Sequence, residues 1–268
     1  MNHASRRLGQ HFLRSPEVLK KIIAAAKLSG RDTVLEIGPG TGVLTRALAE
    51  RAGSVIAVEK DRGLCRSLQA RFAEEGIANV RLICGDVLKV PLEDLAVPER
   101  YLVVANIPYY LTSRLIRRLL EAERQPERIF LMVQREVGLR ITARPPRMNL
   151  LALSVQAYAK PEIVFGAPPE AFSPRPAVSS VLIAIRNISR SLFVRERLDP
   201  AHFFRVIRAA FQGKRKTLEN SLSRNLKLPK PGIAKLLGRR KLAGKRPETL
   251  TIEDWVLLAR AIGRKFPP

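Results

Sequence analysis

A short strand, a glycine cluster and the start of a helix follow one another in Thr33-Val34-Leu35-Glu36-Ile37-Gly38-Pro39-Gly40-Thr41-Gly42. The apolar and β-branched residues up to Ile37 predict a buried strand, and residues 43–51 continue with helical spacing. Glycine lets the backbone approach a ligand where a Cβ atom would clash. The segment therefore predicts the first unit of an α/β sheet, with a ligand outside the carboxyl end of the strand.

The same alternation continues through the first two thirds of the chain. Helices are predicted from Ser15-Pro16-Glu17 onward, over 61–75 and over 111–120. Strands are predicted at 54–59, 80–84, 101–105 and 129–133, followed by a hairpin-like pair at 162–165 and 179–185. Strands that alternate with helices form βαβ units. The sequence thus predicts an α/β fold with a mostly parallel sheet whose last strand is antiparallel.

The pattern changes near Asn187, where strands stop and a basic, all-helical region begins. Phe203, Phe204, Ile207 and Phe211 share one face of a predicted helix. Residues 188–268 carry 20 Lys and Arg against 6 Asp and Glu, a net charge of +14. We therefore expect two domains, residues 1–187 with the sheet and residues 188–268 as a small helical domain that binds RNA.

Charge is the strongest compositional signal. The 268 residues have a formal net charge of +24 and a pI of about 11.1. Such a balance indicates a polyanionic partner, and nucleic acid is the first choice. An anionic membrane is the alternative, but no apolar run reaches the roughly 18 residues that span a bilayer. Residues 1–7 have no apolar segment behind their charges, which argues against secretion.

The cysteines and histidines do not form a recognisable cluster. Cys65 and Cys84 are the only cysteines, and His3, His11 and His202 are scattered along the chain. We therefore expect no structural zinc, no other metal and no disulfide framework. A reducing, cytoplasmic compartment fits this cysteine usage.

Asn106-Ile107-Pro108-Tyr109-Tyr110 follows the apolar strand 102–105 and has the groups needed to hold a purine amine. The Asn106 side chain and the Ile107 carbonyl can each accept a hydrogen from an amino group. Pro108 fixes its own φ and restrains Ile107, and Tyr109 offers a flat face for base stacking. The alternative is a loop asparagine that caps the next helix, with a core tyrosine behind it.

Acidic residues stand at the tips of three successive strands. Glu36 precedes the glycines, where it would repel a pyrophosphate, and the spacing G-x-G-x-G differs from that of a dinucleotide site. A positively charged cofactor such as S-adenosylmethionine suits Glu36 better. Glu59 can accept from two ribose hydroxyls and Asp86 from an adenine amine. Each acid alone could instead be a solvated loop carboxylate or a helix cap.

Two further segments have both a functional and a structural interpretation. Phe172, in Phe172-Ser173-Pro174-Arg175-Pro176, could stack on the base opposite Tyr109, or it could fill the core beside a proline turn. Basic clusters with few neighbouring acids predict phosphate contacts, although a solvated helix face is the usual alternative. The residues predicted to bind RNA are Lys214, Arg215, Lys216, Arg239, Arg240 and Lys241.

Six motifs in order make the chain similar to the KsgA-type ribosomal RNA adenine dimethyltransferase family. Beside the segments already quoted at 36–42, 106–109 and 172–176, they are Gln10-His11-Phe12-Leu13, Gln134-Arg135-Glu136-Val137 and Phe211-Gln212-Gly213-Lys214-Arg215-Lys216-Thr217-Leu218. The resemblance implies a Rossmann-like class I methyltransferase domain with a small helical domain. It implies dimethylation of N6 on two adjacent adenines near the 3′ end of small-subunit (16S) rRNA, in an immature 30S-type particle.

The resemblance also implies which residues contact the cofactor S-adenosylmethionine. They are His11, Leu13, Gly38, Gly40, Glu59, Asp86 and Asn106. We expect a monomer that acts without a membrane. Two departures stand out: His11 replaces the family's usual asparagine, and 144–151 lacks a Tyr-Gly pair, so substrate contacts there are expected to differ.

Rival hypotheses remain open at the level of sequence. A large-subunit rRNA adenine methyltransferase of the antibiotic-resistance type shares the chemistry, and a non-catalytic RNA-binding assembly factor shares the fold. The 211–218 segment favours the small-subunit enzyme, and the intact 106–109 segment favours a working catalyst.

Overall fold

A computed structural model describes residues 11–213 and 216–265, with side chains up to residue 263. Contacts between Cα atoms divide the chain into two compact units. The described residues of unit 1 are 11–139 and 160–188, and those of unit 2 are 140–159, 189–213 and 216–265. Each unit is described by itself below.

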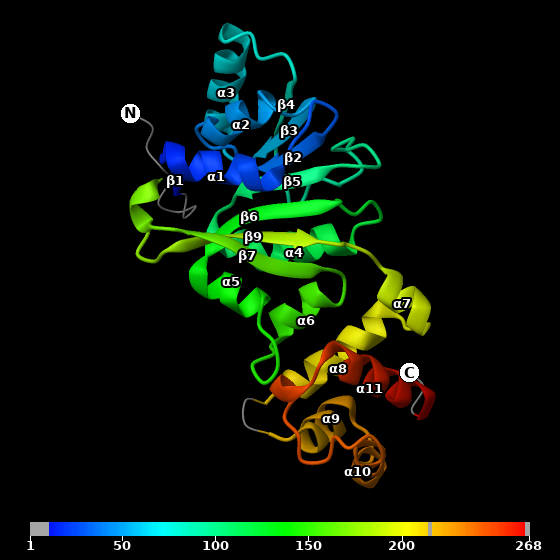
Figure 1. The fold of residues 1–268 in the computed structure, drawn as a ribbon. Helices are drawn as coiled ribbons and strands as arrows, with labels where there is room; N and C mark the ends of the chain where they lie inside the picture. Colours follow the sequence, from blue (N-terminus) through cyan, green and yellow to red (C-terminus); the bar gives the residue numbers. More distant parts are fainter. Residues whose placement is uncertain (1–10, 214–215, 266–268) are drawn as a thin grey trace. The chain divides into compact units, whose positions relative to one another are not determined.

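Unit 1 contains a seven-stranded sheet and a two-stranded one (Figure 1). The strands are β1 (Phe12–Leu13), β2 (Thr33–Ile37), β3 (Ser54–Glu59), β4 (Val80–Cys84), β5 (Leu102–Asn106), β6 (Arg128–Gln134), β7 (Lys160–Ala167), β8 (Phe172–Ser173) and β9 (Ser180–Arg186). The large sheet has the order β4-β3-β2-β5-β6-β9-β7, and β9 runs antiparallel to both neighbours. The predicted α/β fold with a mostly parallel sheet and an antiparallel last strand is confirmed.

Helices connect these strands. They are α1 (Pro16–Ala26), α2 (Val43–Ala49), α3 (Arg62–Glu74), α4 (Thr112–Glu121) and α5 (Arg135–Ile141), with short 3₁₀ turns η2 (Tyr109–Leu111) and η3 (Pro169–Ala171). α1 begins where the Ser15 side chain accepts from the backbone N–H of Val18, with Pro16 in the first turn.

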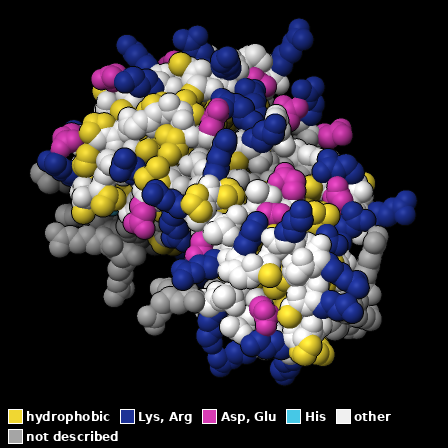
Figure 2. All heavy atoms as spheres, turned by 60° about the horizontal axis from the view of Figure 1, so that its bottom comes forward, with side chains coloured by type: hydrophobic (Ala, Val, Ile, Leu, Met, Phe, Trp, Pro, Cys, Tyr) yellow, Lys and Arg dark blue, Asp and Glu magenta, His cyan; other side chains and the backbone are white. Residues whose placement is uncertain are grey.

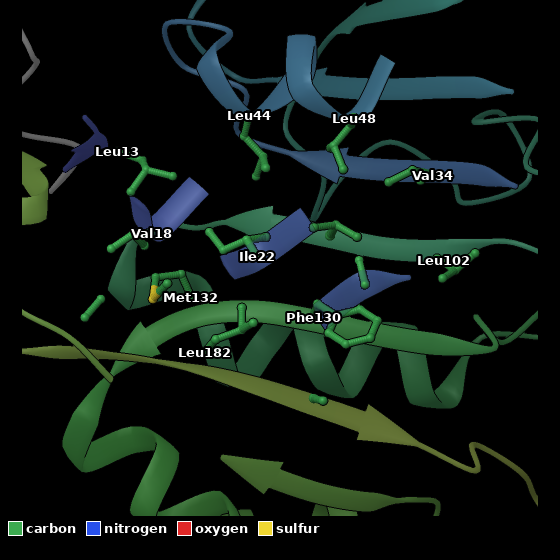
Figure 3. Packing of buried hydrophobic residues seen from close by; sticks show 14 of the residues in the cluster. Leu13, Val18, Ile22, Val34, Leu44, Leu48, Leu102, Phe130, Met132 and Leu182 are labelled. Carbon is green, nitrogen blue, oxygen red and sulfur yellow. The ribbon is translucent and has the colours of Figure 1, made fainter. Parts of the chain in front are cut away.

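One hydrophobic cluster of unit 1 joins the sheet to helices α1 and α2. Side chains from both helices meet those of β2, β5, β6 and β9 (Figure 3). Burying one such aliphatic or aromatic side chain stabilises the fold by about 1.5–3 kcal/mol. The buried residues labelled there are Leu13, Val18, Ile22, Val34, Leu44, Leu48, Leu102, Phe130, Met132 and Leu182.

The parallel strands bring the predicted site residues to one edge of the sheet. β2 and β3 pair in register so that Ile37 lies opposite Val58, and β3 and β4 pair so that Glu59 lies opposite Cys84. β5 pairs in parallel with β2 and ends at Asn106. Since all these strands run in one direction, the residues that follow them share the carboxyl edge.

Cys65 of α3 and Cys84 at the end of β4 form a disulfide bond, with their Cα atoms 5.8 Å apart. The expectation that the chain has no disulfide is therefore wrong. The physical reason is that α3 packs beside β3 and β4, which places two cysteines 19 residues apart in sequence next to each other. Cysteine usage therefore no longer indicates a reducing compartment.

Unit 2 is helical. Its helices are α6 (Leu150–Gln156), α7 (Ser191–Glu196), α8 (Pro200–Phe211), α9 (Leu218–Leu226), α10 (Lys230–Arg239) and α11 (Ile252–Lys265), with the turn η4 (Pro247–Thr249). Stacked and edge-on aromatic rings form part of its core, with centroids 5.0–6.2 Å apart. These rings belong to Tyr158, Phe193, Phe203 and Phe204.

Residues 140–159 group with the C-terminal helices, whereas the sequence analysis placed one boundary after residue 187. α6 packs on α8, and the ring of Tyr158 lies against Phe193 and Phe204. The backbone N–H of Ser189 donates to the Tyr158 carbonyl. The chain leaves unit 1 within α5, after Leu139, and returns at the start of β7, so unit 2 is built from two stretches of sequence.

α11 starts with a capping box, in which Thr251 and Asp254 exchange two hydrogen bonds between side chain and backbone N–H groups. Trp255, in its first turn, is fully buried. Within 11–213 and 216–265, no helix has the length and apolar character to cross a bilayer.

Candidate active site

A cavity lies at the carboxyl ends of the parallel strands of unit 1, and the predicted cofactor residues line it. Its lining includes His11, Leu13, Gly38, Gly40, Glu59, Asp86 and Asn106, together with Glu36, Lys60, Pro108 and Tyr110. All seven residues predicted to contact the cofactor therefore line one cavity.

The glycine loop after β2 has a backbone that other residues rarely adopt. Gly38, Gly40 and Gly42 have φ angles of +69°, +58° and +80°. A Cβ atom on Gly40 would stand 2.7 Å from the ring of Phe12, so a side chain there would clash as well as strain the backbone. The loop keeps the backbone accessible at the cavity, as its composition predicts.

Glu36 is a buried acid with an unmet hydrogen-bonding capacity. It is 1% exposed, and burial raises its pKa to about 8, with the neighbouring Thr45 hydroxyl opposing the shift. Its Oε2 atom has no hydrogen-bond partner within the described part of the chain. An orphaned carboxylate oxygen at a cavity suits a cationic or hydrogen-bond-donating group.

Glu59, at the end of β3, holds the glycine loop in place. Its carboxylate accepts from the backbone N–H of Gly40 at 3.1 Å and from that of Asp61 at 2.9 Å. Burial raises its pKa, and these two backbone bonds act against the shift. Each oxygen retains further acceptor capacity, which is what hydroxyl groups of a ribose require.

Asp86 follows β4 and is already paired on both oxygens. One accepts from the backbone N–H of Leu88 at 3.0 Å, and the other lies 3.0 Å from the ammonium of Lys60. Burial raises the pKa of Asp86, but the bonds to Leu88 and Lys60 outweigh it, so the pKa lies below its ordinary value. Asp86 is therefore an ionised acceptor at the cavity.

Asn106 is oriented by the N-terminal segment. Its amide nitrogen donates to the backbone carbonyl of His11 at 2.9 Å. Because the nitrogen is engaged, the side-chain oxygen is the atom that remains to accept from a ligand. The competing prediction, an asparagine that caps the next helix, finds no support, since no side-chain cap bond begins η2 or α4.

Tyr109 and His11 lie side by side next to Asn106. Their ring centroids are 5.4 Å apart, and the Tyr109 hydroxyl is 2.9 Å from the Ser180 hydroxyl. Nδ1 of His11 donates to the Pro174 carbonyl at 2.7 Å. Burial raises the pKa of Tyr109, opposed by the bond to Ser180. His11 thus links the N-terminal strand to two of the motifs that the sequence singles out.

Two of the predicted catalytic residues are buried. Ile107 is 3% exposed, and Phe172 is 4% exposed and packs in the core of unit 1. Phe172 pairs across β1–β8 with Leu13 and does not line the cavity. In this structure Phe172 occupies the core position that the alternative interpretation described.

Tyr110 and Lys60 are among the cavity residues that the sequence did not single out. Tyr110, 53% exposed, lines the cavity where Tyr109 does not, and Lys60 binds Asp86. Tyr110 follows Tyr109 and Lys60 follows Glu59. No spacing rule shows from sequence which residue of such a pair faces the cavity.

The predicted RNA-binding residues belong to unit 2. Lys216, Arg239, Arg240 and Lys241 are exposed. Lys214 and Arg215 lie outside the described residues. Lys and Arg outnumber Asp and Glu on the face drawn in Figure 2. In 11–213 and 216–265, no group of three or more potential metal ligands is found.

The cavity fits S-adenosylmethionine by its own chemistry. Glu36 is a buried acid with an unpartnered oxygen, and the cofactor's positive charge would favour its ionised form. Glycines leave room for close backbone approach, and Glu59 suits ribose hydroxyls. Together with a seven-stranded sheet in which one strand is antiparallel, this site defines a class I methyltransferase.

Solved structures and sequence relatives agree. A dimethyladenosine transferase from Plasmodium falciparum is 28% identical with a TM-score of 0.81, covering 95% of this chain and 98% of that one. The 23S rRNA methyltransferase ErmE is also 28% identical, with a TM-score of 0.71 over 93% of this chain and 98% of its own.

Among curated proteins, one from Dehalococcoides mccartyi is 44% identical over 254 residues, 94% of this chain and 86% of that protein. One from Moorella thermoacetica is 40% identical over 266 residues, 95% and 91% of the two chains. Both are named ribosomal RNA small subunit methyltransferase A. Residues 1–256 match the family model described as ribosomal RNA adenine dimethylase. The chain belongs to this family and is an rRNA adenine dimethyltransferase.

Proposed function

We propose that this chain transfers two methyl groups from S-adenosylmethionine to N6 of each of two adjacent adenines near the 3′ end of small-subunit rRNA. The observation that carries the proposal is the Asn106 amide, oriented by the His11 carbonyl at the mouth of a cavity with acids and glycines. An oriented acceptor at this place suits an exocyclic amine.

The cofactor supplies an electrophilic methyl group on a sulfonium when it is bound. Glu36 and the backbone at Gly38 and Gly40 would hold its amino-acid end, and Glu59 its ribose hydroxyls. Asp86 would accept from its adenine amine, while His11 and Leu13 would close the cavity from the N-terminal side.

The residues of the chain would hold the substrate amine in position for the reaction. The Asn106 oxygen and the Ile107 carbonyl would each accept one N–H of the substrate amine, which leaves the nitrogen lone pair free for attack. No strong base is needed, because the amine can lose its proton after attack on a reactive donor. Catalysis would then rest on proximity and on an oriented amine dipole.

The flipped adenine would stack on Tyr109, whose hydroxyl is anchored to Ser180. Stacking on the opposite face by Phe172 stays a prediction. It requires a ring that is 4% exposed in this structure to become accessible when RNA binds.

The substrate is best assigned to the small subunit. The curated relatives are named for that subunit, and the family resemblance at 211–218 points to the same enzyme. We propose an immature 30S-type particle as the partner, a monomeric enzyme and a cytoplasmic location. The location follows from the proposed substrate and not from the cysteines.

Methyl incorporation tests the proposal. Small subunits from cells that lack this gene are incubated with the protein and tritiated S-adenosylmethionine, and the rRNA is digested to nucleosides. The expected product is N6,N6-dimethyladenosine at two adjacent positions near the 3′ end. Label in large-subunit rRNA would favour the antibiotic-resistance type of enzyme, and RNA binding without label would favour a non-catalytic factor.

A further inference from the structure

A short loop in unit 2 presents three exposed arginines. Residues 140–149, called the arginine loop here, comprise the last two residues of α5 and the connection to α6, and they contain Arg140, Arg144 and Arg147. The loop contains no Asp, Glu or Lys. It includes residues 144–149 of the stretch that lacks the Tyr-Gly pair expected from the resemblance.

Side-chain amides hold the backbone of the arginine loop in one conformation. The Gln156 amide nitrogen donates to the carbonyls of Ile141 and Ala143, at 3.0 and 2.8 Å. The Asn149 nitrogen donates to the Arg140 carbonyl at 2.9 Å, and its oxygen accepts from the N–H of Ala152 at 3.0 Å. Two amides therefore fix both ends of the loop.

The loop is also tied to the segment before α11. The backbone N–H of Met148 donates to the Glu248 carbonyl at 2.9 Å, and the Met148 side chain is 3% exposed. The Glu248 carboxylate lies 4.0 Å from Arg246. The carboxylate of Glu248 is thus paired with Arg246, and its backbone carbonyl is the group that binds the loop.

Arg144 and Arg147 have no carboxylate partner within the described residues, although ion pairs occupy other arginines of unit 2 such as Arg195 and Arg260. Arg140 lies in the last turn of α5, where a cation is favoured by the helix dipole in any case. Arg144 and Arg147 therefore carry the argument. Two guanidinium groups on a fixed loop, with no internal partner, suit an external anion.

We propose that the arginine loop binds backbone phosphates of the substrate RNA, as a contact separate from the basic clusters predicted at 214–216 and 239–241. The proposal rests on the proposed function only in taking RNA as the substrate. Guanidinium matches a phosphate with two parallel hydrogen bonds. Because the backbone is already fixed, binding orders fewer groups than it would in a flexible loop.

The test compares two triple variants with the same loss of charge. Arg140→Gln, Arg144→Gln and Arg147→Gln together neutralise the loop. Arg100→Gln, Arg117→Gln and Arg195→Gln together neutralise three exposed arginines that are paired with acids. Binding of both proteins to purified small-subunit rRNA is measured from 50 to 300 mM salt.

The loop variant should bind about tenfold more weakly at 100 mM salt. Its log-log salt slope should fall by about 1.4 if Arg144 and Arg147 each bind one phosphate, and by about 2 if Arg140 binds one as well, at roughly 0.7 per lost contact. The control variant should stay within about threefold of wild type. Equal losses of RNA affinity in both variants would mean that only the overall charge of the protein matters. An unchanged affinity of the loop variant would mean that the loop does not contact RNA. Either result overturns the proposal.

This outcome is separable from that of the proposed function. Affinity for S-adenosylmethionine should be unchanged in both variants, which also reports that unit 1 is folded. If wild type makes no dimethyladenosine but the loop variant still loses RNA affinity, the proposed function fails and the phosphate contact stands. If wild type methylates rRNA and the loop variant binds RNA as tightly as wild type does, the proposed function stands and the phosphate contact fails.

Discussion

At the scale of single residues, Glu36 should make stability depend on pH in an unusual direction. Its pKa rises from 4.5 to about 8 on folding. The folded state therefore binds more protons than the unfolded state between these values, and the free energy of unfolding should fall as pH rises through them, by about 5 kcal/mol in total.

Glu36→Gln tests this, because an amide keeps the shape of the side chain and does not titrate. Denaturant unfolding from pH 5 to pH 9 should show a smaller decline for Glu36→Gln than for wild type. Parallel curves for the two proteins would contradict a buried, protonated Glu36.

Gly40 should be needed for the cofactor more than for folding. An alanine at φ +58° is strained by about 1–2 kcal/mol, and its Cβ would displace the Phe12 ring beside the cavity. Gly40→Ala should therefore weaken S-adenosylmethionine binding by at least about tenfold in calorimetry. Gly76→Ala is the matched control, with φ +67° and open space around it. Gly76→Ala should lower stability and leave the affinity for S-adenosylmethionine unchanged. Equal affinity of the two variants for S-adenosylmethionine would refute the role of Gly40.

Local motifs allowed the sequence to predict many of the site residues. Glu36, Gly38, Gly40, Glu59, Asp86 and Asn106 each stand at a strand end, and all line the cavity. The contacts that orient them could not be predicted, since Asn106 is held by a carbonyl 95 residues away. The same applies to Phe172, whose burial depends on a two-residue strand without periodicity.

At the scale of elements, the long periodic segments were predictable and the short ones were not. β2 and β3 have the predicted bounds, because they are buried and almost continuously apolar. β4, an edge strand with the sequence Val-Arg-Leu-Ile-Cys, also has the predicted bounds. The pair β1–β8 and the short helices α6 and α7 were not predicted, since each is too short to show a period. Their structure is set by tertiary contacts.

The disulfide between α3 and β4 should stabilise the fold measurably. Closing a loop with a sequence separation of 19 contributes about 3 kcal/mol in the chain-entropy model. Reductant should lower the melting temperature of wild type by several degrees. A variant with both Cys65→Ala and Cys84→Ala should melt at one temperature with and without reductant; equal sensitivity of the two proteins would exclude the bond.

At the scale of the whole molecule, charge should govern affinity for RNA. Residues 188–268 hold a net charge of +14. Binding to single-stranded rRNA should therefore weaken steeply with salt, at about 0.7 per phosphate neutralised on a log-log plot. Replacing Arg239, Arg240 and Lys241 by Gln should lower that slope by about 2. If the RNA affinity of wild type does not change with salt concentration, the positive charge of this region does not serve to bind RNA.

The division of the chain shows where sequence reasoning stops at this scale. The change in composition near Asn187 predicts the helical region, but nothing in composition connects 140–159 with it. That connection depends on side chains such as Tyr158, which packs against rings far along the chain. The arginine loop lies in this segment, and only the structure relates it to the basic region.

The central claim is that Asn106 holds the substrate amine for attack on the methyl donor. Single-turnover transfer of tritiated methyl from S-adenosylmethionine to immature small subunits tests it, with wild type compared with Asn106→Ala at saturating cofactor and with folding checked by circular dichroism. We expect a folded variant whose rate falls by about 100-fold or more. A folded Asn106→Ala protein that methylates near the wild-type rate would contradict it.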